Sequence, residues 1–114
     1  MKIDGCQINI NKGDTGVIRF IFSHKKHPVP VGTHNFRLII KKNKELSDDS
    51  AIMDVTKMGN ETTDSFISFE IPSDVTDNDA GSYFWGLRVI SGNFVSTIKE
   101  GIFTIDRGTY YGAN

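Results

Sequence analysis

Alternation of apolar residues at every second position is the feature that most limits how this chain can fold. One segment has this spacing at Ile18, Phe20 and Phe22. Another has it at Ile67, Phe69 and Ile71. Successive side chains of a strand point to opposite faces, so this spacing places the apolar residues of each segment on one face. The sequence therefore predicts β-strands rather than amphipathic helices.

Turn-forming residues separate several short segments of this kind. The predicted strands cover residues 7–11, 17–22, 36–41, 52–56, 67–71, 83–90 and 94–105. In the last strand Ile98 and Phe103 can share a face only if an extra residue lies between them, so we expect a β-bulge near Glu100 and Gly101. A single helical turn is expected after Pro72, capped by Ser73.

Seven or eight short strands with turns about ten residues apart are typical of an antiparallel β-sandwich. We expect one all-β domain over residues 1–107 and a C-terminal tail over residues 108–114, since 114 residues suit a single domain. The predicted core consists of Ile18, Phe20, Leu38, Ile40, Ile67, Phe69, Tyr83, Trp85, Leu87 and Phe103.

Composition argues against several classes of protein. Thirteen Lys and Arg residues stand against 14 Asp and Glu, giving a formal net charge of −1, so we expect no nucleic-acid partner. The longest apolar runs are far shorter than the roughly 20 residues that a membrane-spanning helix needs, so we expect no membrane segment. No apolar stretch follows the first charged residue, so no secretion signal is expected. The single cysteine, Cys6, cannot form an internal disulfide.

The segment 79–85 carries the most specific motif. Asp79, Gly81 and Tyr83 resemble the Asp-x-Gly-x-Tyr-x-Cys motif at the start of strand F in immunoglobulin domains. Tyr83 would make the tyrosine corner of that fold, and Trp85 occupies the position of the second disulfide cysteine. The resemblance implies an immunoglobulin-like sandwich without a disulfide, in which Trp85 and either Phe20 or Phe22 fill the core.

A second resemblance covers residues 5–106. The segments 13–15, 80–83 and 97–105 look like those of the immunoglobulin-like N-terminal domain of bacteriophage baseplate upper proteins and of related phage tail and prophage domains. Such domains are structural and dock virion components onto one another. The resemblance implies a virion protein assembled in the cytoplasm of the bacterial host, with other virion proteins as partners. A homo-oligomer is also expected, since virion parts repeat by symmetry.

Three histidines, His24, His27 and His34, lie in or beside one predicted loop. Three imidazoles could bind zinc or nickel. The neighbouring Lys25 and Lys26 carry charges that oppose a divalent cation, and we therefore expect loop histidines and no metal.

Asp74, Asp77 and Asp79 form the other cluster of candidate ligands. The cluster lacks the spacing of a calcium loop, so we expect turn and capping roles. The sequence also lacks a nucleophile elbow, a phosphate-binding loop and a catalytic pair of carboxylates, so we predict neither a catalytic residue nor a cofactor and expect no enzyme.

Apolar residues in excess of those needed for the core suggest a docking surface. On one sheet Ile39, Phe84, Ile90 and Ile102 are left facing outward, and Val17, Ile21 and Phe66 are left on the other. The predicted interface, with its basic rim, consists of Arg37, Ile39, Lys41, Phe84, Arg88, Ile90 and Ile102. The alternative is that loops or the tail cover these residues.

Three functions follow from these patterns. The leading hypothesis is a non-catalytic phage or prophage virion protein of the baseplate, tail or fibre attachment, acting through protein–protein contacts. The first alternative is a module that binds carbohydrate or a host surface through Tyr110 and Tyr111, because Trp85 is predicted to face inward. The second is a protein that binds metal through the three histidines.

Overall fold

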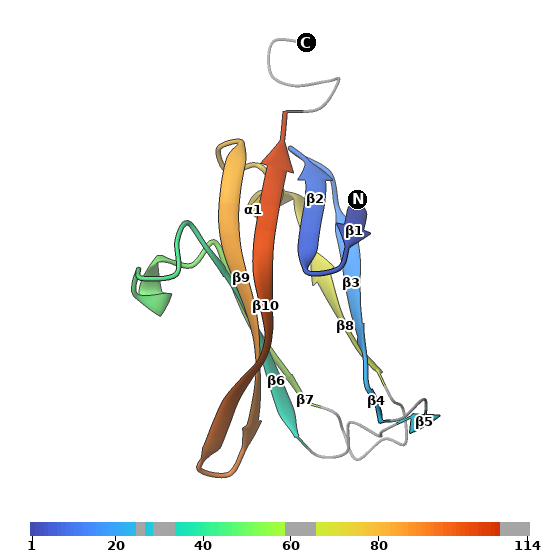
Figure 1. The fold of residues 1–114 in the computed structure, drawn as a ribbon. Helices are drawn as coiled ribbons and strands as arrows, with labels where there is room; N and C mark the ends of the chain where they lie inside the picture. Colours follow the sequence, from blue (N-terminus) through green and yellow to red (C-terminus); the bar gives the residue numbers. More distant parts are fainter. Residues whose placement is uncertain (25–26, 29–33, 59–65, 108–114) are drawn as a thin grey trace.

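The structure is a computed structural model that describes residues 1–24, 27–28, 34–58 and 66–107. Two β-sheets lie face to face, and Figure 1 shows the smaller sheet alongside one face of the larger. The molecule is elongated, with principal extents of 46 × 29 × 22 Å. The two ends of its long axis therefore lie far apart.

The larger sheet has six strands in the order β1-β2-β10-β9-β6-β7. Their bounds, in that order, are Lys2–Asp4, Gln7–Asn11, Phe94–Asp106, Gly81–Ser91, Asn35–Lys41 and Met53–Met58. Neighbouring strands are antiparallel except β2 and β10, which are parallel. The expectation of antiparallel pairing alone is therefore wrong at β2, because this strand meets the last strand of the domain rather than its neighbour in the sequence.

The smaller sheet pairs β3 (Gly16–Ile21) with β8 (Phe66–Ile71). A two-residue strand β4 (Ser23–His24) follows β3 and pairs with β5 (His27–Pro28). A single turn of helix, α1 (Ser73–Thr76), connects β8 to β9.

Aromatic rings join the two sheets at the centre of the core. The ring centroid of Phe20 on β3 lies 5.6 Å from that of Trp85 on β9 and 6.0 Å from that of Phe69 on β8. Trp85 is 1% exposed, and all ten residues of the predicted core are buried. Phe20 and Trp85 thus make the contact between sheets that a disulfide makes in antibody domains. The chain is an all-β, immunoglobulin-like sandwich without a disulfide.

The tyrosine corner predicted from the motif is present. The hydroxyl of Tyr83 donates a hydrogen bond to the backbone oxygen of Asp79 at 2.7 Å. Gly81 has a φ of +144°, a backbone conformation that a residue with a Cβ rarely adopts. Burial of the hydroxyl, with the charge of Asp79 nearby, raises the pKa of Tyr83 above its ordinary value of 10.0.

The β-bulge lies at a different residue from the one predicted. Thr97 pairs with Arg88 and Lys99 pairs with Leu87, so Ile98 is the extra residue rather than Glu100 or Gly101. Gly101 stays in regular register opposite Trp85. Its lack of a side chain serves close packing instead, because an added Cβ would lie 2.8 Å from the Cβ of Cys6.

Two local predictions need further correction. The helical turn α1 exists, but Pro72 is its N-cap residue and no side chain caps it, so Ser73 does not have the predicted role. Strand β1, the short strands β4 and β5 and the 3-10 turn η1 (Asp48–Ser50) were not predicted. The side chain of Ser47 caps η1 by accepting a hydrogen bond from the backbone nitrogen of Asp49 at 3.3 Å.

Candidate functional site

The loop between β6 and β7 covers part of the outer face of the larger sheet. Its central side chain is Asp48, which accepts a hydrogen bond from Nζ of Lys41 at 2.9 Å. The carboxylate of Asp48 also lies 3.4 Å from Arg88 and 3.7 Å from Arg37. Nζ of Lys41 donates a second bond to the backbone oxygen of Leu46 at 2.7 Å. Strands β6 and β9 therefore hold the loop in place by charge.

The partners of these carboxylates lower their pKa values. The hydrogen bond from Lys41 is the main reason that the pKa of Asp48 falls below its ordinary value of 3.8. Arg37 binds Asp54 with two hydrogen bonds of 2.8 and 2.6 Å, which lowers the pKa of Asp54 and raises that of Arg37. Both carboxylates are thus held in their ionised form.

Two residues of the predicted interface are not available to a partner. Ile39 is 4% exposed and Lys41 is 6% exposed, because the loop that carries Asp48 lies over them. The interface prediction is wrong for these two residues, and the covering loop considered as its alternative accounts for them. A pocket of about 150 Å³ remains between this loop and the sheet, and it is lined by Ile39, Lys41, Lys44, Asp48, Phe84, Gly86, Arg88, Thr97 and Glu100.

The other predicted interface residues lie on the outer face of the same sheet. Arg37, Phe84, Arg88 and Ile90 are half-buried, and Ile102 is exposed. Whether this face binds a partner stays a prediction.

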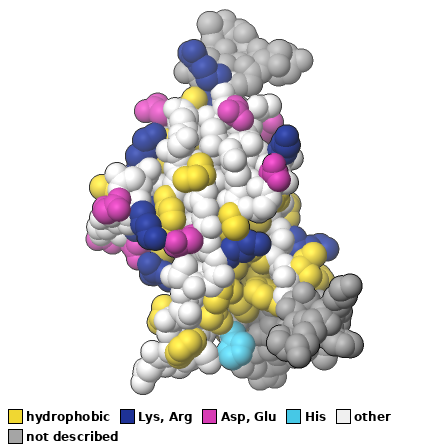
Figure 2. Space-filling model, viewed as in Figure 1, with side chains coloured by type: hydrophobic (Ala, Val, Ile, Leu, Met, Phe, Trp, Pro, Cys, Tyr) yellow, Lys and Arg dark blue, Asp and Glu magenta, His cyan; other side chains and the backbone are white. Residues whose placement is uncertain are grey.

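More exposed apolar side chains lie near the end of the β9–β10 hairpin. Phe94 is 62% exposed, Val95 56% and Ile98 42%. Asn35, the first residue of β6, pairs with Ile90, so no strand of the described chain lies beside the hairpin beyond that point. We call Phe94, Val95 and Ile98 the hairpin tip, although only Phe94 lies beyond the end of β6. Phe94 faces the core side of the sheet and Val95 the opposite side, because neighbouring residues of a strand alternate. Figure 2 shows yellow apolar side chains gathered in the lower part of the face in view.

Sequence reasoning missed the hairpin tip, although a signal for it was present. The pattern predicted the strands on both sides of Gly92 and Asn93, but not that they extend past their neighbours. Counting the pairs of β9 with the shorter β6 would have found the overhang, provided that the register was known.

An apolar groove lies at the opposite end of the molecule. It has a volume of about 400 Å³ and lies where β3 begins and β8 ends. Its lining residues are Thr15, Gly16, Val17, Glu70, Ile71 and Pro72. Val17, one of the outward-facing residues noted in the sequence, is 53% exposed here.

The candidate metal ligands are only partly described. His34 is exposed, whereas the side chains of His24 and His27 lie outside the described residues, as do Tyr110 and Tyr111. Within residues whose placement is described, no three His, Cys, Asp or Glu side chains are grouped closely enough to hold a metal ion.

The acidic cluster before β9 makes its recorded contacts through the backbone. The backbone oxygen of Asp77 accepts a hydrogen bond from Lys12, and that of Asp79 accepts the bond from Tyr83. Asp77 is also the C-cap of α1. These contacts agree with the predicted turn roles.

Comparisons with known proteins find a likeness in structure. No family model matches the chain, and no curated protein matches it. Among solved structures the chain is similar to the immunoglobulin-like domain of mouse leukocyte-associated immunoglobulin-like receptor 1, crystallised as a strand-swapped dimer. The TM-score is 0.49, the sequence identity is 16%, and the match covers 92% of this chain and 93% of that domain. In the described part of the chain, no helix is long and apolar enough to cross a membrane.

Proposed function

We propose that this chain is a non-catalytic structural module of a bacteriophage or prophage virion, in its baseplate, tail or fibre attachment. It works by binding other virion proteins. The sequence resemblance described above supplies the virion context, and the immunoglobulin-like sandwich supplies a rigid support for docking surfaces.

The observation that carries the proposal is the exposure of the hairpin tip. Phe94 and Val95 leave more than half of their surface in contact with solvent. Large exposed apolar side chains such as these are typical of sites where a protein binds another protein. The long strands β9 and β10 pair along their length, so the tip is held on an ordered arm.

The experiment is to look for the chain in particles. Virions are purified from the strain that encodes the chain after induction of its prophage, and their proteins are quantified by mass spectrometry. We expect the chain at a fixed ratio to tail proteins, with immunogold label at the tail or baseplate. Purified particles without the chain would refute the proposal.

Two variants refine this test. Phe94→Ser should reduce incorporation into particles at least tenfold, whereas Ile3→Ser, which alters an exposed apolar residue on β1, should leave it unchanged. If both variants were incorporated equally, the hairpin tip would have no role in assembly. Saturable binding of the purified chain to a glycan array would instead favour the carbohydrate-binding class.

A further inference from the structure

We propose that the pocket under the β6–β7 loop binds a small organic carboxylate, with the apolar body of the ligand over Gly86 and its carboxylate against Arg88. The site goes beyond the proposed function, because it takes a small molecule rather than another protein. Its volume of about 150 Å³ is close to that of an engineered protein cavity that binds benzene, so the body of the ligand is about the size of one ring.

A glycine on β9 forms the floor of the pocket. Gly86 pairs with Ile39 on β6 and with Glu100 on β10, and all three line the pocket on the outer face of the sheet. Because Gly86 has no side chain, the sheet is hollowed at this point. The atoms within 4 Å of a Cβ added there belong to the ring of Phe84, at 3.6 and 3.8 Å. Ile39 is buried and Phe84 is half-buried, so two sides of the hollow are apolar.

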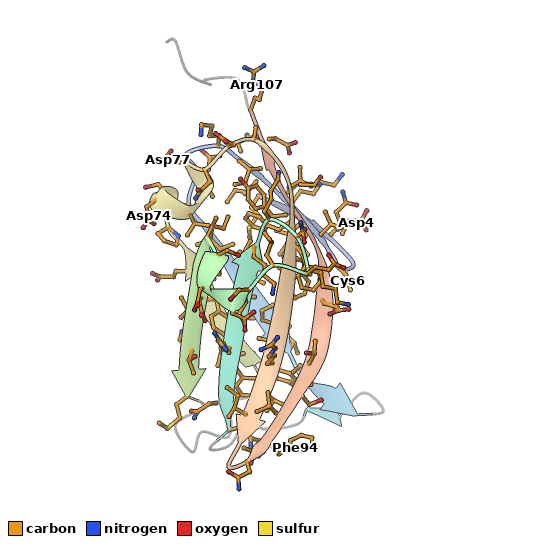
Figure 3. The ribbon with its side chains drawn as sticks, turned by 90° about the vertical axis from the view of Figure 1, so that its left-hand side faces the viewer. Asp4, Cys6, Asp74, Asp77, Phe94 and Arg107 are labelled. Atoms are coloured by element: carbon orange, nitrogen blue, oxygen red, sulfur yellow. The ribbon has the colours of Figure 1, made fainter. Side chains whose placement is uncertain are left out.

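The β6–β7 loop forms the roof. Nζ of Lys44 binds Oε1 of Glu100 at 2.9 Å and lies 5.5 Å from the ring centroid of Phe84. Asp48, further along the loop, binds Lys41 at 2.9 Å. Figure 3 looks onto this face of the sheet, and the pale green loop crosses in front of β6 and β9. The loop therefore contacts β10 on one side of the hollow and β6 on the other.

Positive charge exceeds negative charge in the lining of the pocket. The lining includes three cations and two carboxylates, which are Lys41, Lys44, Arg88, Asp48 and Glu100. Each carboxylate accepts a hydrogen bond from a lysine at 2.9 Å, whereas Nη1 of Arg88 lies 3.4 Å from Asp48. The guanidinium of Arg88 makes no other hydrogen bond or ion pair in the described ranges. A guanidinium has five donors, so Nε and Nη2 of Arg88 can bind the carboxylate of a ligand.

The two ends of the pocket select a ligand with two different parts. Phe84, Gly86 and Arg88 follow one another on one face of β9, each about 7 Å from the next. Thr97 pairs with Arg88 and lines the pocket, so its hydroxyl adds a donor at the charged end. An inorganic anion would leave the apolar end without contact, and a neutral ring would leave the excess positive charge unbalanced. A compact carboxylate with an apolar body meets both requirements.

Titration of the purified chain followed by nuclear magnetic resonance tests the site, with sodium benzoate as the probe. We expect saturable shifts at the backbone amides of Gly86, Arg88 and Thr97, with a Kd on the order of 1 mM. Benzamide lacks the charge and acetate lacks the ring, so each should bind about tenfold more weakly at the same ionic strength. The inference is overturned if benzoate gives no saturable shift at these amides, or if benzamide or acetate binds as tightly.

A substitution at Arg88 tests the position of the carboxylate. Arg88→Gln should weaken benzoate binding about tenfold and leave benzamide binding unchanged, because the lost charge contacts only the carboxylate. Equal weakening of the two probes would show that Arg88 acts by holding the loop through Asp48, and would overturn its assignment. Arg19→Gln is the matched control, since it changes an exposed arginine on the smaller sheet and should bind benzoate like wild type.

Substitutions at Gly86 test the position of the apolar body. Gly86→Val fills the floor and should abolish binding of benzoate and benzamide, with circular dichroism showing that the variant is folded. Ser82→Val adds an apolar side chain at an exposed position on the same face of β9 and should leave binding unchanged. Gly86→Ala should weaken benzoate binding by a smaller factor, and it decides the question if Gly86→Val does not fold. Undiminished binding in a folded Gly86 variant would place the ligand elsewhere.

Discussion

The indole nitrogen of Trp85 donates a hydrogen bond of 2.9 Å to the backbone oxygen of Cys6. Trp85 lies on β9 and Cys6 lies in the turn between β1 and β2, and β10 runs between these strands. The indole can reach across β10 because the residue opposite it is Gly101. An added Cβ at Gly101 would overlap the carbonyl group of Cys6. The central core residue is thereby tied to the edge of the sheet.

Gly101→Ala should displace the turn that contains Cys6. The added methyl group meets backbone rather than a flexible side chain, so we expect a loss of about 1–3 kcal/mol in the free energy of unfolding. Urea denaturation measures this loss. Gly86→Ala is the control, because its methyl group would meet only the ring of Phe84 at an ordinary distance of 3.6 Å. Equal losses in the two variants would contradict the argument.

Trp85→Phe should keep an aromatic ring in the core but leave the oxygen of Cys6 without its donor. The expected loss is about 1–3 kcal/mol, whereas Trp85→Ala should cost about 3–5 kcal/mol because it also opens a cavity. The chain has one tryptophan, so unfolding of these variants is followed by circular dichroism rather than fluorescence. If the unfolding midpoint of Trp85→Ala barely differs from that of wild type, Trp85 is not at the centre of the core.

Tyr83→Phe should lose the hydrogen bond to Asp79 and about 1 kcal/mol of stability. Burial raises the pKa of Tyr83, so its phenol should ionise above pH 10.0. The difference between the ultraviolet titrations of wild type and Tyr83→Phe isolates this group from the other two tyrosines. A difference curve centred below pH 10.0 would show that the hydroxyl is not buried in solution.

Asp48→Asn should loosen the loop over Ile39 and make the free energy of unfolding less dependent on pH. The pKa of Asp48 is lower in the folded chain than the ordinary 3.8, so its ionised form stabilises the fold above that value. This stabilisation is lost as the pH falls through the folded pKa. We expect a loss on the order of 1 kcal/mol at pH 7 and a smaller difference from wild type at low pH.

Thermal unfolding of Asp48→Asn from pH 7 down to pH 2 measures this effect. Asp49→Asn is the matched control, because Asp49 has no ion pair within the described ranges. In Asp48→Asn, hydrogen exchange should be faster than in wild type at the backbone amides that the β6–β7 loop covers. Identical acid profiles for the two variants would show that Asp48 does not hold the loop.

Much of the fold follows from local patterns. The alternation around Phe20 and Phe69 predicted strands with the correct buried faces, and the motif from Asp79 to Tyr83 predicted the corner that the structure contains. These features depend on the period of a strand and on one turn, so neighbouring residues are sufficient to indicate them.

The exposure of apolar side chains could not be predicted from these local patterns. Ile39 faces outward on its strand as expected, yet a loop anchored by Asp48 buries it, and that anchoring depends on cations from β6 and β9. Conversely, Phe94 faces the same side as core residues but lies beyond the end of β6 and is exposed. Both outcomes depend on lengths and contacts of segments that are distant in the sequence.

The sequence alone determined the class of the fold, the absence of an internal disulfide and the identity of the core, because each depends on residue type and strand period. Only the tertiary structure decided which apolar residues remain outside. It paired β2 with β10, placed Ile98 as the bulge and carried the hairpin past its neighbours. Strand register and loop placement are set by contacts across the whole chain, and these decide where a partner can bind.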